Sequence, residues 1–311
     1  MKKDFNMKNI QNLKKNLVLF LIFALCASFC LAQTSSNYLP KIDVDSARKN
    51  YAKKITITPM DGVTISDGLI VLEPKKEETS YTISGYFNGQ IENRTKNTEI
   101  KLKNAFIENN SGKPALYAQS KVILSTVKDT INYVVSDYVV SDGVPASNSS
   151  EKVSFGQSPA KSGAVHCKKN LVLGGSGILY VIGGVYHAVK ADDVKIKGSG
   201  IFYLRGTEKG SCINCHSLAV EKDKSFKAYF LASKNGIKAD STISIASGNF
   251  YFYDNGTAMK TDTVDENSDE NSDKNRNENH GITIYDGKFV LRGNDALYET
   301  DKNEFKSRVK F

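Results

Sequence analysis

The stretch His187–Leu204, "HAVKADDVKIKGSGIFYL", decides the fold. Apolar and polar residues alternate in "AVK" and "DVKI", and this period of two is typical of strands rather than helices. A Gly-Ser-Gly turn then interrupts the pattern, and "IFYL" continues it with β-branched and aromatic residues. The stretch therefore predicts a short strand, a bend, a second strand, a glycine turn and a third strand.

The same unit recurs along the chain. Its starts are Ala115, Ala164, Ala188, Cys212, Gly236, Ala258 and Ala296. From Ala164 they are 24, 24, 24 and 22 residues apart, and a gap of 38 follows. This period is too short for a propeller blade, which needs about 40 residues or more, and a sandwich would not require the same residue types at the same offsets. We predict an all-β fold, a right-handed parallel β-helix with 22–24 residues per turn, in which each coil lies about 4.8 Å above the last.

Stacked repeats turn equal offsets into columns. The position after each start is apolar and is predicted to face the core: Leu116, Val165, Val189, Ile213, Ile237, Met259 and Leu297. Two positions further on, most repeats carry a small residue: Ala118, Cys167, Ala191, Cys215 and Ala239. The alternation of side chains on a strand places this second column inside as well.

The columns give a structural explanation for a motif with the spacing C-x-x-C-H, Cys212 to His216, which is the spacing of c-type haem attachment. Cys215 stands where other repeats carry Ala, and a buried free Cys behaves as a small apolar residue. On one strand the two thiols would point to opposite faces. Cys167 shares the column of Cys215, but two coils, roughly 9.6 Å, separate them, which exceeds the about 7 Å that a disulfide spans. We predict no haem and free thiols at all of these positions.

The positions between the inward columns are predicted to face solvent. One stripe mixes rings with ammonium groups and supplies the candidate carbohydrate-binding residues: Tyr117, His166, Lys190, Lys238, Lys260 and Tyr298. Rings stack on the apolar faces of sugars, and Lys donors pair with hydroxyls or uronate carboxylates. The candidate Ca²⁺ ligands are carboxylates in or next to the second stripe: Asp192, Asp193, Asp240 and Asp262. A solvated sheet face, on which Lys and Asp pair for solubility, is the alternative interpretation.

The N-terminus predicts export. A Lys-rich start precedes an apolar run of 16 residues, 17–32, shorter than the roughly 20 that span a membrane. We predict a signal peptide over residues 1–32, with an uncleaved anchor and a lipoprotein as alternatives. A linker over 33–55 and a carbohydrate-binding domain over 56–311 follow. Loops are expected near 136–163 and 263–280, where the polar run "TVDENSDENSDKNRNEN" begins at Thr263.

The composition of the exported chain restricts its partners. Loss of five Lys and one Asp with the signal peptide lowers the formal net charge from +8 to +4, too mild a value to indicate a nucleic-acid partner. Three cysteines remain, an odd and low count that argues against a disulfide framework. We expect a monomer that is secreted or held at the cell surface, without membrane contact after cleavage.

The repeats also carry a family resemblance. "GGSGILYV", "HAVKADDVKIKGSGIFYL" and "NGIKADSTISIASGNFYFY" resemble bacterial extracellular carbohydrate-binding domain proteins with a right-handed parallel β-helix, whose architecture is similar to that of pectate lyases. The likeness spans roughly residues 80–300. It implies a secreted polysaccharide binder, often with calcium and without established catalysis. Family members commonly begin each unit with Asp-Gly-Ile, and this chain lacks that Asp.

Three functions are consistent with these patterns. The first is a secreted, non-catalytic protein that binds polysaccharide, acidic and calcium-assisted in its most specific form, along the stripe of rings and lysines. The second is a polysaccharide lyase acting on uronate polymers, for which no residue has a distinctive context. The third is a structural adhesin that displays the two loops to a partner. We predict no catalytic residue.

Overall fold

The computed structural model describes residues 42–136, 162–184, 186–262 and 281–299, and the backbone of 303–310. The predicted signal peptide, the first part of the predicted linker and most of both predicted loops lie outside the described residues. All of the strands below lie in the unit formed by residues 43–311. No helix in the described ranges is long and apolar enough to cross a bilayer.

The unit formed by residues 43–311 is built almost entirely of strands. A five-residue helix, α2 (Val44–Arg48), lies within the range predicted as a linker. The strands are β1 (Thr56–Thr58), β2 (Val63–Ser66), β3 (Leu69–Leu72), β4 (Ser80–Asn88), β5 (Gln90–Asn93), β6 (Thr98–Asn109), β7 (Leu116–Ala118), β8 (Val122–Thr126), β9 (Ile131–Ser136), β10 (Gly163–Cys167), β11 (Leu171–Gly175), β12 (Ile178–Gly183), β13 (His187–Lys190), β14 (Asp193–Ile196), β15 (Ile201–Arg205), β16 (Ser211–Val220), β17 (Lys227–Ile245), β18 (Asn249–Thr261), β19 (Gly281–Arg292), β20 (Ala296–Glu299) and β21 (Asn303–Lys310).

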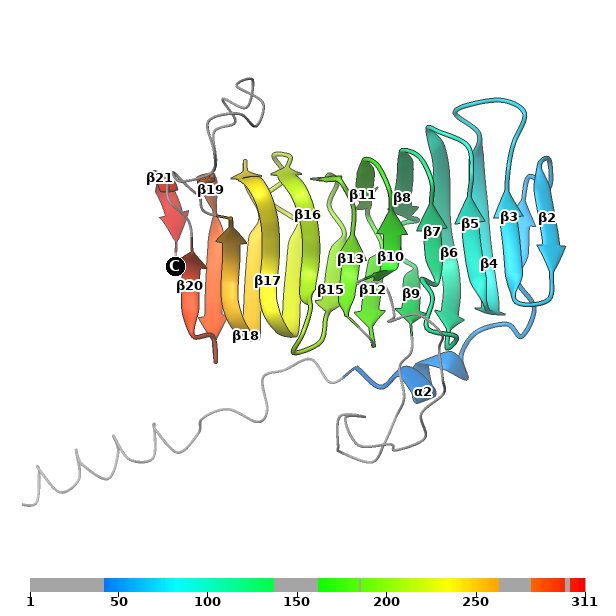
Figure 1. Cartoon of the computed structure of the whole chain (residues 1–311), viewed down its shortest axis with the longest axis horizontal. Helices are drawn as coiled ribbons and strands as arrows, with labels where there is room; N and C mark the ends of the chain where they lie inside the picture. The colour runs from blue at the N-terminus through cyan, green and yellow to red at the C-terminus, as the bar shows by residue number, and fades with distance from the viewer. Residues whose placement is uncertain (1–41, 137–161, 185, 263–280, 300–302, 311) are drawn as a thin grey trace, which may run out of the picture. The chain divides into compact units, whose positions relative to one another are not determined.

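Successive repeats lie side by side in register, as the columns predicted. Val165 pairs with Leu116 and Val189, and the series continues through Ile213, Ile237 and Met259. Three such series run in parallel through β7–β10–β13, β8–β11–β14 and β9–β12–β15. Figure 1 shows the strands following one another in sequence order, from β2 in blue to β20 in red.

The predicted fold class nevertheless needs a correction. The all-β content is confirmed, but the prediction of a right-handed parallel β-helix, a solenoid of uniform coils, is wrong. In the part of the chain that the structure describes, all 21 strands belong to one sheet, and the parallel strands close around the core as a β-barrel does. The physical reason is that the later strands continue through the bends: β17, with 19 residues, pairs with β15, β16, β18 and β19. The N-terminal pairs β1–β4 and β2–β3 are antiparallel.

Unusual backbone angles make these bends possible. Ala232 and Asp254 have φ of 42° and 52°, and they follow paired residues of β17 and β18. Where tighter turns occur, the chain uses glycine: Gly198 has φ of 96°, and a Cβ there would lie 2.5 Å from the Gly175 carbonyl oxygen of the preceding repeat. Left-handed angles are costly for other residues, so the Gly-Ser-Gly turn in the sequence fixes this corner.

The core consists of the inward residues of every repeat. The column Val165, Val189, Ile213, Ile237 and Met259 has no exposed surface. Phenylalanine rings stack on the inside of the later repeats, with centroids 4.6 Å apart between Phe230 and Phe252 and 5.0 Å apart between Phe250 and Phe289. Each fully buried side chain of this size contributes about 1.5–3 kcal/mol through removal of apolar surface from water.

The three cysteines among the described residues, Cys167, Cys212 and Cys215, are free and buried. Cys212 and Cys215 both lie within β16 and are 0% and 2% exposed, so neither thiol is presented to solvent. The Cys212 thiol donates to the Leu204 carbonyl and contacts the Ser233 hydroxyl, which donates to Asn255. Burial raises the pKa of Cys212 to about 11, and the thiol therefore serves as a packed, protonated group.

Candidate functional site

Most residues of the predicted binding stripe are neighbours on adjacent strands, and we call this line of residues the outward row. Its members are Tyr117, His166, Lys190, Asn214, Lys238 and Lys260, and each pairs in register with the next. All of them are half-buried, between buried positions on either side. At about 4.8 Å for each parallel neighbour, the row extends over roughly 24 Å. It is therefore long enough to contact several consecutive units of an extended polymer.

One end of the outward row is aromatic and uncharged. The Tyr117 ring meets the His166 ring edge-on at 5.6 Å, and the Lys168 ammonium lies 5.9 Å from the centre of the Tyr117 ring. Burial, together with Lys190 and Lys168, lowers the pKa of His166 to about 4. Its Nδ1 lies 2.8 Å from the Ser162 hydroxyl. His166 is therefore neutral at pH 7 and offers one donor and one acceptor.

The other end carries three lysines, Lys190, Lys238 and Lys260. The Lys238 ammonium lies 3.1 Å from an Asp262 oxygen and 3.6 Å from an Asp240 oxygen, with 28% of its side chain exposed. Lys238 and Lys260 are direct register neighbours. Like charges on adjacent strands repel each other, and the two carboxylates reduce that cost. This end provides ammonium donors at successive rungs.

The four candidate calcium ligands do not gather. Asp240 and Asp262 share the Lys238 ammonium, while Asp193 accepts hydrogen bonds from Ser217 at 2.5 Å and Asn170 at 3.2 Å. Asp192 lies exposed on the loop before β14. Within the ranges that the structure describes, no group of three or more His, Cys, Asp and Glu side chains is placed to hold a metal ion. These residues therefore do not fit a calcium site by themselves.

Tyr298 lies outside the outward row. The register pairs Lys260 with Glu299 and Met259 with Tyr298, one position away from the predicted alignment. The prediction relied on the similarity of "ALYAQS" and "ALYETD" across a gap of 38 residues, and that insertion shifts the pairing. Tyr298 remains 38% exposed in the last repeats, but it does not continue the line of the lysines.

A second line of side chains was missed by the sequence reasoning. We call it the tyrosine column: Tyr133, Tyr180, Tyr203, Tyr229 and Tyr251, each paired with the next from β9 to β18. The rings stack at centroid distances of 4.5, 4.5, 4.6 and 4.5 Å with interplanar angles of 12° or less. The signal was present, since "ILYV", "IFYL" and "NFYFY" carry Tyr at the same offset.

The tyrosine column presents ring edges and hydroxyls outward. The stacked rings cover one another's faces, and Tyr51 meets Phe106 and Tyr133 edge-on at the N-terminal end. Burial raises the pKa of Tyr133, Tyr180 and Tyr229 to about 12, with a smaller effect from neighbouring phenols. These three hydroxyls remain protonated at physiological pH. With its faces covered, the column has little surface on which a sugar could stack.

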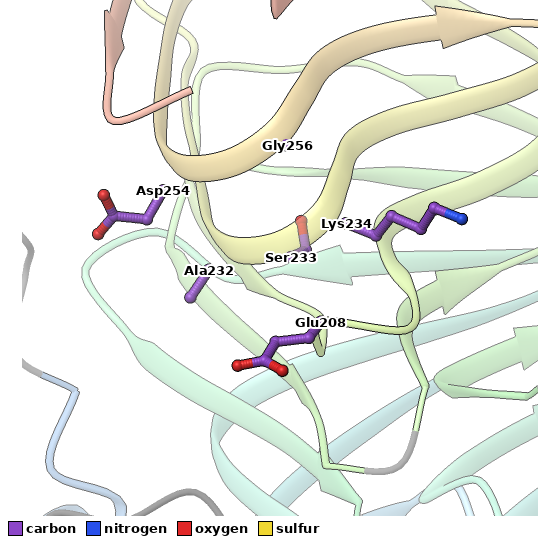
Figure 2. Close-up of a pocket in the computed structure, with 6 residues that line it drawn as sticks. All are labelled: Glu208, Ala232, Ser233, Lys234, Asp254 and Gly256. Atoms are coloured by element: carbon purple, nitrogen blue, oxygen red, sulfur yellow. The ribbon is translucent and has the colours of Figure 1, made fainter. Parts of the chain in front are cut away.

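A hollow of about 440 Å³ lies at the bend between the tyrosine column and the outward row. It is lined by Glu208, Ala232, Ser233, Lys234, Asp254 and Gly256. Figure 2 shows the carboxylates of Glu208 and Asp254 on the same side, while Lys234 extends away from them. The Ser233 hydroxyl is engaged with Asn255 and with the Asn235 carbonyl, so it is not available as a donor to a ligand. Because two carboxylates border it, the hollow is unsuited to an anionic ligand.

Part of the chain matches a known protein family. Residues 75–216 match the model of a family described as "Carbohydrate-binding domain-containing protein". The matched range includes Tyr117, His166 and Lys190, and it ends before Lys238 and Lys260. No curated protein matches the chain.

Among solved structures, the chain is similar to one titled "Structure of the polysaccharide lyase-like protein from C. thermocellum, Gadolinium derivative". The sequences are 17% identical, the likeness covers 84% of this chain and 97% of that chain, and the TM-score is 0.54. At this identity the likeness concerns the fold alone. The chain thus combines a fold found in a polysaccharide lyase-like protein with a segment that matches a carbohydrate-binding domain family.

Proposed function

We propose that this protein is a secreted, non-catalytic binding protein that holds an extended polysaccharide along the outward row. The observation that carries the proposal is the unbroken register from Tyr117 to Lys260, which places six polar or aromatic side chains on consecutive parallel neighbours. A linear polymer presents chemically similar units at regular intervals, and this surface presents contacts at regular intervals too. The match of residues 75–216 to a carbohydrate-binding domain family supports the polymer being a polysaccharide.

The chemistry of the outward row favours acidic sugars. Lys190, Lys238 and Lys260 supply ammonium donors, which form stronger hydrogen bonds with carboxylates than with neutral hydroxyls. Asp240 and Asp262 hold Lys238 in place and repel a further negative group beside it. At the other end, the edge-on pair of Tyr117 and His166 offers an apolar surface and neutral polar atoms to a sugar ring.

Calcium takes no step in this proposal. The predicted ligands Asp192, Asp193, Asp240 and Asp262 do not form a cluster, and an ammonium group lies between two of them. The sugar contacts that we propose need only the side chains of the outward row.

Export is the other part of the proposal. The apolar run at residues 17–32 after a Lys-rich start supports a signal peptide, and polysaccharide outside the cell would then be the accessible partner. Three buried free thiols impose no requirement for an oxidising compartment, and they are compatible with one because none of them is exposed to react.

A glycan array with the protein, read with and without a calcium chelator, tests the proposal. We expect binding to extended polysaccharides, strongest for uronate-containing ones, and unchanged by the chelator. Absence of binding to every glycan would overturn the proposal, and loss of binding on chelation would reinstate calcium as a ligand bridge. Absorbance near 235 nm from uronate polymers, about the position of unsaturated products, would instead show the lyase activity that general base catalysis produces.

A further inference from the structure

A second hollow, of about 440 Å³, lies on a different part of the sheet from the outward row. We call it the glycine hollow. It is lined by Glu99, Lys101, Ile123, Ser125, Thr126, Val127, Lys128, Gly174, Gly175, Ser176 and Lys197. These residues come from β6, β8, β11 and the turns that follow β8, β11 and β14. None of them belongs to the outward row, so the two surfaces can be tested separately.

The hollow exists because one position in a row of side chains is a glycine. Across adjacent strands, Lys101 pairs with Ser125 and Ser125 pairs with Gly174. The residue before Lys197 pairs with Leu173, the residue before Gly174, so Lys197 is the next neighbour of Gly174. A Cβ on Gly174 would lie 3.4 Å from Cγ and 3.8 Å from Cε of Lys197. The Lys197 stem therefore leans over the missing side chain, which brings its ammonium group to the hollow.

The charges around the glycine hollow are predominantly positive. Lys101, Lys128 and Lys197 face one carboxylate, Glu99, which accepts hydrogen bonds from Ser125 at 2.9 Å and Ser80 at 3.1 Å and pairs with Lys101 at 3.1 Å. Burial opposes the charge on Glu99, but these bonds together outweigh it and lower its pKa. Glu99 is thus engaged with Lys101. Neither the Lys128 nor the Lys197 ammonium group makes a hydrogen bond or ion pair in the described ranges, although Lys197 adds to the effect of Lys195 in lowering the pKa of Glu221.

The lining also matches the requirements of a sugar unit. Ile123 supplies an apolar side chain to the lining, and Gly174 leaves room beside it. Ser125 and Ser176 add hydroxyls, and two lysines add ammonium groups. Binding sites for small ligands commonly combine a largely apolar lining of about 300–1,000 Å³ with a few placed polar groups. The hollow at the bend near Glu208 and Asp254 has the opposite charge, which makes the glycine hollow the better site for an anion.

We infer that the glycine hollow binds one negatively charged sugar unit of a polysaccharide, with Lys128 and Lys197 paired to its carboxylate or sulfate group. The inference rests on the proposed function, since it takes the polymer to be a polysaccharide, and it adds a second contact site together with the charge of the sugar unit that this site accepts. The space at Gly174 accommodates the ring, and Ser125 and Ser176 offer hydroxyls to it.

Titration calorimetry of the full chain tests this inference with three probes: polygalacturonate for carboxylates, dextran sulfate for sulfate esters, and dextran as a neutral glycan. Lys128→Ala/Lys197→Ala removes the two ammonium groups, and Gly174→Ala fills the space there at a position whose backbone angle other residues adopt. Lys195→Ala is the matched control. Lys195 is an exposed residue of β14, two positions before Lys197, and its ammonium group already pairs with Glu221.

We expect the double variant to bind at least one charged probe about tenfold or more weakly than the wild type, since a charge-assisted hydrogen bond contributes about 1.5–3 kcal/mol. Gly174→Ala should weaken the same probe, and Lys195→Ala should not. The charged probe that the double variant binds more weakly shows whether the hollow takes a carboxylate or a sulfate group. If the wild type binds charged probes and the double variant binds them equally well, this inference is wrong and the proposed function stands. If the wild type binds no glycan at all, both fail.

Discussion

The tyrosine column and the outward row are built by the same register, yet they serve different purposes. In the column, five identical side chains stack with ring centroids 4.5–4.6 Å apart, and each ring covers the face of its neighbour. In the row, an aromatic ring, an imidazole, an amide and three ammonium groups succeed one another at the same spacing.

The column and the row differ in how contacts between neighbouring side chains affect stability. Each aromatic pair contributes about 0.5–1.5 kcal/mol beyond its area burial, so a column of tyrosines stabilises the repeats that it joins. Lysines on adjacent strands repel, and the pair Lys238 and Lys260 would weaken the sheet without nearby carboxylates. A surface that retains residues at a cost to stability is where function is expected. The column therefore stabilises the fold, and the row is where we propose that the ligand binds.

Removing one ring from the tyrosine column should have the largest effect. Tyr203 stacks on Tyr180 and Tyr229, so Tyr203→Ala loses two aromatic pairs and opens a gap in the column. We expect the free energy of unfolding to fall by about 2–4 kcal/mol, less than for a fully buried aromatic residue because Tyr203 is half-buried. Chemical denaturation measures this. Tyr203→Phe, which keeps the ring, should stay within about 1 kcal/mol of the wild type; an equal loss in both variants would show that stacking is not the cause.

Acid should destabilise the protein through its buried histidines. Burial, with a contribution from nearby lysines, lowers the pKa of His166 to about 4 and that of His187 to about 3. Both rings are neutral in the folded protein, so their contribution to stability is complete above their ordinary pKa of about 6.5 and is lost as pH falls toward 4 and 3. The melting temperature should therefore decrease between pH 7 and pH 4, and in His166→Gln it should decrease less. An identical pH dependence in that variant would contradict this origin.

The pair between Lys238 and Asp262 should have the smallest effect on stability. Asp262→Asn removes one partner of a partly exposed ion pair, so we expect a loss of about 0.2–1 kcal/mol in unfolding free energy. The same change relieves repulsion between Asp262 and an acidic sugar, so affinity for a uronate polymer should rise. Urea denaturation and binding by calorimetry are measured on one preparation, with Lys195→Ala as a surface control. Weaker uronate binding would mean that Asp262 itself contacts the ligand.

The sequence predicted the stacking of repeats because equal offsets repeat for four intervals from Ala164. The positions of Val189, Ile213 and Ile237 followed from that alone, as did the burial of all three cysteines. The prediction of the last repeat was wrong at Tyr298, because an insertion lies between the two segments being aligned. Closure of the sheet was missed because no glycine marks the left-handed positions at the bends in β17 and β18, which are Ala232 and Asp254.

The candidate site was less accessible to sequence reasoning. The residues of the outward row were found because they alternate with an apolar column. The glycine hollow was not, since the positions of Lys128 and Lys197 around it depend on the register of three strands. The tyrosine column was visible as a repeated letter, but only the distances between rings show that its faces are covered.

The affinity of Lys190→Ala/Lys238→Ala for the best glycan of the array, measured beside Tyr203→Phe, tests the central claim most directly. The account predicts that the double lysine variant binds about tenfold or more weakly, with a melting temperature close to that of the wild type, since two charge-assisted contacts are lost. Tyr203→Phe should bind as tightly as the wild type. Unchanged affinity in the lysine variant, or a loss confined to the tyrosine variant, would contradict the claim that the outward row holds the polysaccharide.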